Sequence, residues 1–184
     1  MSKESIFSSE KIRILLLLIV SFAISLLVAT KDAIKLDEPV ILEYFYTGMI
    51  HPDHQPMFYQ IISIWSSVFG ESDLGIRSFS ILLFLITIPF FYFWIKKNSD
   101  HSAVPLIASI LFISNTFILN HEIYAYFYSI AYLLTILSFL LSEDLLANKK
   151  TAIALTIINI LGLLNFFMFS YVVISQLLDL CVHF

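Results

Sequence analysis

Residues 35–77 read KLDEPVILEYFYTGMIHPDHQPMFYQIISIWSSVFGESDLGIR, and this stretch decides how the rest of the chain is arranged. Together with Asp32 it holds half of the 14 acidic residues, and it also contains two of the five histidines and three of the five prolines. Long apolar runs flank it on both sides. A polar loop between apolar helices is where a membrane protein can place reactive groups, because the helices themselves carry few of them.

The overall composition is that of an integral membrane protein. Of the 184 residues, 59% are hydrophobic and 13% are charged, whereas a soluble domain carries about 25% charged residues. The net charge of -4 provides no basic surface for nucleic acid, so we expect membrane lipid rather than nucleic acid as a partner. The single cysteine, Cys181, cannot form an internal disulfide.

An apolar run precedes the polar loop. Residues 12–30 are about as long as a bilayer crossing requires, which predicts a first transmembrane span. A cleaved signal peptide is the alternative interpretation, because a basic start precedes the run. Cleavage after Ala29 would put Leu27 where the processing site needs a small residue, so an uncleaved span is favoured.

Further apolar runs follow the loop. They predict an all-α fold in which residues 1–184 form one membrane domain, a multi-pass transmembrane helical bundle. The expected spans after the first are 74–95, 103–119, 123–141 and 151–168, followed by an incomplete span at 171–184.

The outer loop of this bundle, residues 31–73, is predicted to carry short amphipathic surface helices. The run Asp37-Glu38-Pro39 is typical of a helix start, and an aromatic helix is expected at 40–49. After the break at 51–56, apolar residues recur every three or four positions from Phe58 to Phe69, which predicts a helix along the membrane surface. We expect the helix to end at Gly70 and Ser72 to cap the next one.

Seven of the ten basic residues fall on alternate connections of the predicted bundle. By the positive-inside rule this distribution predicts a cytoplasmic N-terminus and an acidic loop that faces outward. The seven residues are Lys3, Lys11, Arg13, Lys96, Lys97, Lys149 and Lys150.

The adjacent carboxylates Asp37 and Glu38 are the first candidate site residues. A carboxylate at the membrane edge can take a proton from an attacking hydroxyl that lies within hydrogen-bond reach. An Asp before a Pro is equally typical of a helix cap, and the two roles are compatible.

Two further candidates, Asp53 and His54, lie between Pro52 and Pro56. With His51 they could orient a substrate or bind a metal ion, or they could simply form a polar turn. Two histidines and one aspartate lack a fourth ligand at a recognisable spacing, so we expect neither a metal ion nor another cofactor.

Arg77 lies one turn into the predicted span 74–95. Near a helix end its side chain could extend to the membrane interface at little cost. Alternatively, its planar guanidinium could pair with an acidic loop residue or with a phosphate.

The order of these features resembles the integral-membrane glycosyltransferases of the GT-C type, and within them the protein O-mannosyltransferases and lipid A aminoarabinose transferases. The family pattern is an Asp-Glu pair, a D-H-P-P-L-Y-Y-like run, an F-G-containing segment leading to an arginine, and a later acidic-aromatic turn. The matching stretches are Asp37-Glu38, DHQPMFY at 53–59, FGES at 69–72 with Arg77, and EIYAYFY at 122–128.

This resemblance implies a transferase that takes a sugar from a polyprenyl-phosphate donor to an acceptor at the outer face of the membrane, with inversion. Asp37 would be the general base, and Glu38, Asp53, His54 and Arg77 would shape the substrate site. The membrane expected for it is the bacterial cytoplasmic (inner) membrane. The sequence identifies neither the sugar nor the acceptor.

Two positions depart from the family pattern, and the resemblance covers only the N-terminal part of such enzymes, which are longer. Gln55 replaces a proline, and Tyr126 stands where an arginine is usual, which removes a phosphate partner. We therefore expect a family member by descent that could be inactive as a truncated chain. The alternatives are a non-catalytic multi-pass protein or partner subunit derived from such an enzyme, and a small transporter. The scarcity of polar residues in mid-span argues against the transporter.

Overall fold

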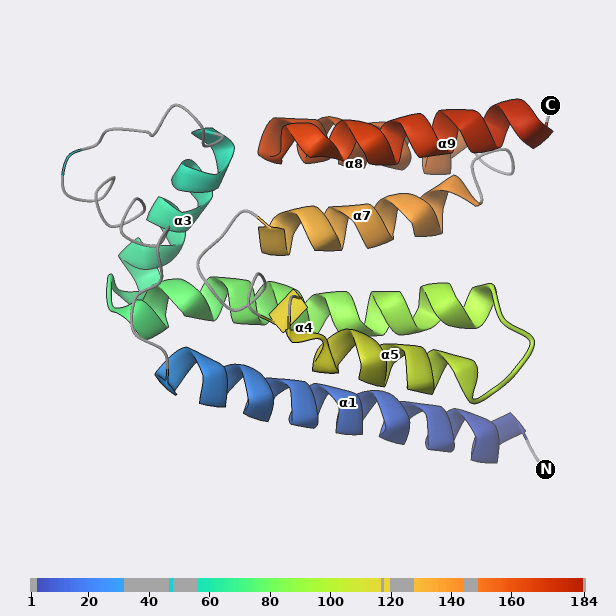
Figure 1. Cartoon of the computed structure of the whole chain (residues 1–184), viewed down its shortest axis with the longest axis horizontal. Coiled ribbons are helices and arrows are strands. Elements are labelled where there is room, and N and C mark those ends of the chain that lie inside the picture. The colour runs from blue at the N-terminus through green and yellow to red at the C-terminus, as the bar shows by residue number, and fades with distance from the viewer. Residues whose placement is uncertain are drawn as a thin grey trace.

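A computed structural model describes residues 3–31, 47, 56–116, 118–119, 128–143 and 149–183 of the chain. Within these ranges the regular elements are helices and no strand occurs, so the all-α prediction is confirmed (Figure 1). The elements are α1 (Lys3–Lys31), α3 (Pro56–Phe69), α4 (Asp73–Lys97), α5 (Val104–Ser114), α7 (Tyr128–Ser142), α8 (Lys149–Asn165), the 3₁₀ turn η1 (Phe167–Phe169) and α9 (Ser170–His183).

Helix α4 is at the centre of the arrangement. It packs against α1, α5 and α7, and α7 in turn packs against α8. The long axes of these helices run nearly parallel, and α3 lies obliquely across one end of them (Figure 1). The N- and C-terminal ends of the chain lie at the opposite end. Among the described residues, the polar connection 70–72 lies at the α3 end and the polar connection 98–103 lies at the opposite end.

Two helical segments of the described chain are long and apolar enough to cross a membrane. They are Ser9–Thr30, with 22 residues, and Asp73–Lys97, with 25 residues, and they include the predicted spans 12–30 and 74–95. The other apolar helices have 10–17 residues. The two long helices support an association with a membrane, and the multi-pass topology stays a prediction.

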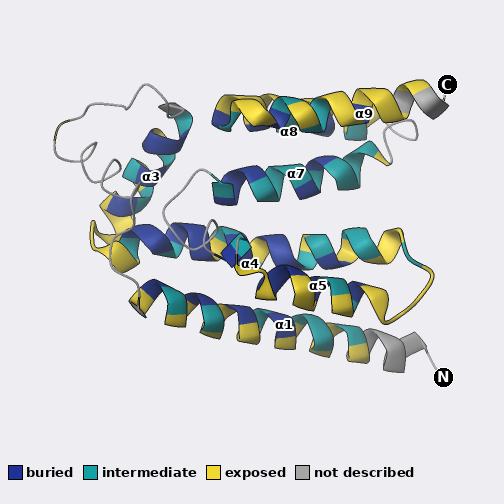
Figure 2. Cartoon of the chain, viewed as in Figure 1, coloured by how far each residue is buried: buried dark blue, intermediate teal, exposed yellow. Residues whose placement is uncertain are grey.

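The exterior of the bundle is apolar. Exposed and buried residues alternate along α1 so that one side faces α4 and the other faces outward (Figure 2). Leu16, Phe22 and Leu27 on the outward side are between 50% and 56% exposed. An apolar exterior of this kind is suited to lipid rather than to water, because a soluble protein rarely exposes a continuous apolar surface.

Small polar residues occupy several of the helix interfaces. The side chains of Ser21 and Ser25 on α1, Ser80 on α4 and Ser109 on α5 are fully buried. Ser129 on α7 donates to Ser80 Oγ on α4 at 3.4 Å. Small residues let helix backbones approach closely, and they are enriched at helix contacts in membranes. The interior and exterior therefore have the character expected of helices in lipid.

The apolar run 103–119 is divided rather than formed as one helix. α5 ends at Ser114, and Asn115 has an extended backbone with ψ 114°. Its side-chain Oδ1 accepts from the backbone amide of Ile118 at 3.3 Å. Asparagine side chains compete in this way with the helical hydrogen bonds of the backbone, which accounts for the break.

The connection from α8 to α9 depends on close packing of an aromatic ring. Phe166 adopts an extended conformation, and η1 then turns the chain so that Phe169 lies against Gly162 of α8. A side chain at residue 162 would bring a Cβ within 2.5 Å of the Phe169 ring. Glycine at this position therefore permits the sharp reversal between the two helices.

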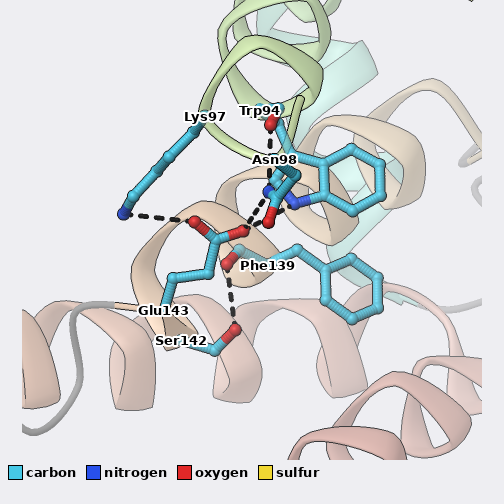
Figure 3. Close-up of polar contacts among 6 residues, drawn as sticks. All are labelled: Trp94, Lys97, Asn98, Phe139, Ser142 and Glu143. Atoms are coloured by element: carbon cyan, nitrogen blue, oxygen red, sulfur yellow. Dashed lines mark hydrogen bonds and ion pairs between the residues drawn. The ribbon is translucent and has the colours of Figure 1, made fainter. Parts of the chain in front are cut away.

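A cluster of polar contacts joins the C-terminal ends of α4 and α7 (Figure 3). Glu143 accepts hydrogen bonds from the Trp94 indole at 3.0 Å and from Asn98 at 2.6 Å, and it pairs with Lys97 at 3.1 Å. The Trp94 ring stacks on Phe139 with centroids 5.6 Å apart. One carboxylate thus fixes two helix ends that are 45 residues or more apart in sequence.

Candidate functional site at the α3 end of the bundle

The α3 end of the bundle is formed by α3, the last turn of α1 and the first turns of α4. Its apolar core is the buried face of α3, where Phe58, Tyr59 and Ile62 pack against Ile76 and Phe79 of α4. The opposite face of α3 remains exposed, including Ile64 at 70% and Val68 at 72%. One side of α3 is thus packed on α4, and the other side carries exposed apolar residues. A helix that lies along a membrane surface also exposes apolar residues, which contact the lipid.

The Trp65 side chain fixes α3 to the start of α4. Its indole N–H lies 3.1 Å from the Gly75 carbonyl oxygen and 3.0 Å from Ser78 Oγ. The ring also stacks on Phe69 with centroids 4.1 Å apart and contacts Phe79. Tryptophan combines a large apolar ring with one donor, so it can anchor the helix by packing and by hydrogen bonding together.

The turn between α3 and α4 confirms the two local predictions for Gly70 and Ser72. Gly70 has a positive φ of 86° and donates its amide to Ser66 at 2.8 Å, which ends α3. The Ser72 hydroxyl accepts from the Gly75 amide at 3.1 Å, which caps α4. Gly75 is required for a different reason, because a Cβ there would lie 2.5 Å from the Gly70 carbonyl oxygen.

Arg77 is buried within this end of the bundle, with only 2% of its surface exposed. Its Nη1 donates to the carbonyl oxygen of Ala29 at 2.6 Å. Ala29 belongs to the last turn of α1, where carbonyl groups lack a partner within the helix, so Arg77 caps α1 while it emerges from α4. The side chain is thus directed to α1 and is buried, rather than extended to the surface of the bundle.

A buried guanidinium creates a strong local electrostatic potential. It stays charged at all physiological pH values, and burial reduces the screening of its charge. Such a group favours negative charge nearby, whether from a carboxylate or from a phosphate. The α3 end therefore holds a fixed positive charge at the contact of α1 and α4.

Arg77 is the one predicted site residue that the structure describes. Asp37, Glu38, Asp53 and His54 lie outside the described residues, as does the short helix expected at 40–49 apart from Thr47. In the described ranges, no group of three His, Cys, Asp or Glu side chains is placed to hold a metal ion.

A polar network joins the helices near the C-terminus and was not predicted from the sequence. Ser138 of α7 donates to Asn159 Oδ1 of α8 at 2.7 Å, and Asn159 donates to Gln176 Oε1 of α9 at 3.0 Å. Gln176 donates back to Ser138 Oγ, which closes a ring. Asn159 and Gln176 were visible in the sequence as polar residues within apolar runs. Their spacing could not show that they bind one another.

A small cavity of about 200 Å³ lies beside the N-terminal half of α7, between Tyr128, Tyr132 and the η1 turn. Its lining is largely aromatic and apolar, and the Tyr128 ring packs edge-on against Phe166 with centroids 5.5 Å apart. Such a lining suits an alkyl or isoprenoid group better than a charged one.

Comparisons with protein-family models, with curated protein sequences and with solved structures found no match to this chain.

Proposed function

We propose that this chain is a multi-pass membrane protein of glycosyltransferase type, which takes a sugar from a polyprenyl-phosphate donor and passes it to an acceptor at the outer face. The observation that carries the proposal is the burial of Arg77 at the α3 end of the bundle. The resemblance to GT-C transferases includes Arg77 among the residues that shape the substrate site. A cation held there is suited to the phosphate of the donor.

The exterior and interior of the bundle support the membrane placement. Exposed leucine, isoleucine and phenylalanine side chains cover α1, α8 and α9, while buried serines occupy the helix contacts. In water this distribution would leave a large apolar surface exposed. In lipid the apolar side chains of the exterior contact acyl chains, and the small buried serines let the helices approach closely. The lipid tail of a polyprenyl donor requires such an apolar environment.

The distribution of charge supports the orientation. Lys96 pairs with Glu10 of α1, and Lys97 pairs with Glu143, which follows α7. The end of the bundle that carries these pairs is opposite α3 (Figure 1), and it also contains the starts of α1 and α8 with Arg13, Lys149 and Lys150. We call it the basic end. The positive-inside rule assigns the basic end to the cytoplasm and the α3 end to the outer side.

The chemistry proposed for the site is an inverting displacement. The acceptor hydroxyl attacks the anomeric carbon of the sugar while Asp37 accepts its proton. The bond from that carbon to the phosphate oxygen breaks, and the electron pair leaves with polyprenyl phosphate. A general base of this kind contributes about 10²–10⁴-fold to a rate, and fixed positive charge stabilises the leaving phosphate.

The proposal is tested by measuring sugar transfer from a polyprenyl-phosphate donor by the purified chain in lipid. We expect turnover by the wild-type chain and a loss of about 10²-fold or more in Asp37→Asn, because the amide cannot accept the proton. Asp73→Asn is the matched control, since Asp73 is an exposed carboxylate in the first turn of α4. The absence of turnover in the wild-type chain, or equal turnover in the wild type and Asp37→Asn, would contradict the proposed role.

One observation favours a second candidate, a non-catalytic multi-pass protein. The bond from Arg77 to the Ala29 carbonyl oxygen is sufficient to give the arginine a structural role at the contact of α1 and α4. Comparing donor binding with stability in Arg77→Lys separates the two candidates. If Arg77 has only the structural role, this change lowers the unfolding temperature and leaves binding of a polyprenyl-phosphate analogue by the folded fraction unchanged.

A further inference from the structure

We propose that a cavity at the basic end of the bundle binds the headgroup of a zwitterionic phospholipid that carries a primary ammonium. The cavity has a volume of about 400 Å³ and lies between α1, the end of α4 and the turn that leads to α5. Its size is within the range of small-molecule sites. The inference uses the membrane placement but is independent of any sugar transfer.

The level of the cavity corresponds to the headgroup region of a bilayer. Its walls are formed where the apolar parts of α1 and α4 give way to polar turns, at Arg13 and Lys96. Its lining includes two buried residues, Tyr92 of α4 and Pro105 of α5. Tyrosine is enriched at this level of membrane proteins, because its ring is apolar and its hydroxyl is polar.

Two cations of the lining are suited to the phosphate of the headgroup. Arg13 makes a single hydrogen bond among the described residues, from Nη1 to the Ser102 carbonyl oxygen at 3.3 Å. The rest of its guanidinium fork is therefore available, and this fork matches the oxygens of a phosphate. Lys96 adds a second positive charge from α4, which its ion pair with Glu10 partly neutralises.

Two carboxylates of the lining distinguish a zwitterionic headgroup from an anionic one. Glu10 pairs with Lys96 at 2.6 Å through Oε1, and its side chain is only 16% exposed. Asp100 lines the same cavity from the turn after α4. A headgroup with negative charge alone would be repelled by these groups, whereas an ammonium beside the phosphate would pair with them.

The chemistry of the carboxylates favours a primary over a quaternary ammonium. A primary ammonium donates hydrogen bonds to carboxylate oxygens, which strengthens the pairing. A quaternary ammonium has no such donor and is bound mainly by the faces of several aromatic rings. The described lining offers one phenol ring, Tyr92, and one imidazole, His101, which is fewer rings than a cage of several aromatic faces needs. The acyl chains would lie along the exposed side of α1, where Ile12 and Leu16 are more than half exposed.

The test measures lipid retention by the full chain purified in detergent and presented with phosphatidylethanolamine, phosphatidylcholine or phosphatidylglycerol. Native mass spectrometry counts the lipids that remain bound. We expect the wild-type chain to retain phosphatidylethanolamine several-fold more than either of the others. Equal retention of the three lipids would overturn the proposal, whatever the result of the sugar-transfer assay.

Variants of the lining residues test whether the retained lipid is bound in this cavity. We expect Arg13→Gln to lower phosphatidylethanolamine retention several-fold, and Glu10→Gln to shift the preference toward phosphatidylglycerol. Asp100→Asn should shift the preference in the same direction, and as an exposed turn residue it provides a test that does not disturb the ion pair of Glu10. Lys149→Gln is the control, because it removes an exposed charge of the basic end outside the cavity lining.

A soluble headgroup distinguishes a lipid from a small solute. Glycerophosphoethanolamine carries the same charges without acyl chains. At a matched concentration we expect it not to displace the lipid, since the chains contribute binding along α1. Equal binding of the soluble compound would overturn the assignment of a lipid as the ligand. If Arg13→Gln and Asp100→Asn both retained the three lipids as the wild-type chain does, the assignment of the site to this cavity would be overturned.

Discussion

At the scale of single residues, two glycines beside the candidate site have distinct physical roles. Gly70 supplies a left-handed backbone conformation with open space around it, whereas Gly75 supplies space between two backbones. We expect Gly75→Ala to lower the free energy of unfolding by about 1–3 kcal/mol, because its Cβ would meet the carbonyl oxygens of Phe69 and Gly70 at 2.8 and 2.5 Å. Denaturant titration of the purified chain measures this loss.

The matched control for that prediction is Gly70→Asn. Asparagine tolerates the left-handed region better than other residues with a side chain, and nothing lies within 4 Å of a Cβ at this position. We expect the loss in Gly70→Asn to be smaller than in Gly75→Ala. A reversed order would mean that backbone conformation, and not close approach, limits this turn.

At the scale of helices, the docking of α3 depends on the indole of Trp65. Trp65→Phe keeps most of the ring but removes the donor to the Gly75 oxygen and to Ser78 Oγ. We expect a loss of about 0.5–1.5 kcal/mol, since Ser78 still donates to the Gly75 carbonyl oxygen at 2.5 Å and leaves it satisfied. Thermal or denaturant unfolding of the single variants and of the double variant with Ser78→Ala gives the coupling energy.

Ser67→Ala is the control for these variants, because among the described residues the exposed Ser67 hydroxyl bonds only the Ile64 carbonyl oxygen of its own helix. Its expected change lies within about 0.5 kcal/mol. Strict additivity of Trp65→Phe and Ser78→Ala would show that the two side chains do not act together.

The sequence predicted several features of the helices that depend on neighbouring residues, and it did not predict those that depend on distant contacts. The amphipathic spacing from Phe58 to Phe69 predicted α3, and Gly70 and Ser72 marked the turn after it correctly, because these are local signals. The break at Asn115 was not predicted, because it depends on the competition of one side chain with the backbone. The partner of Arg77 was not predictable either, since Ala29 is 48 residues away and a carbonyl oxygen has no signature in sequence.

At the scale of the whole molecule, the ring of Ser138, Asn159 and Gln176 joins three helices through groups that bind only one another among the described residues. We expect Ser138→Ala to lower the free energy of unfolding by about 0.6–2 kcal/mol, which is the range for hydrogen bonds between membrane helices. The measurement is unfolding in detergent with a denaturing surfactant.

Ser175→Ala is the control with the same chemical change. The Ser175 hydroxyl is exposed and bonds the Val172 carbonyl oxygen of its own helix at 2.8 Å. Equal losses in Ser138→Ala and Ser175→Ala would show that the ring does not hold α7, α8 and α9 together.

The polar ring also bears on the function classes considered from the sequence. The described helices α7, α8 and α9 carry more polar groups at their contacts than the sequence indicates, since Asn159 and Gln176 appear isolated when each apolar run is considered alone. Their hydrogen bonds close on one another and on Ser138. A structural role thus accounts for these groups, and they add no support for a transport path.

The bond between Arg77 and Ala29 has a consequence for biogenesis. Ala29 is synthesised 48 residues before the arginine that binds its carbonyl oxygen. The hydrogen bond that joins α1 to α4 can therefore form only after Arg77 has left the ribosome. This contact is a late step of synthesis rather than an early one.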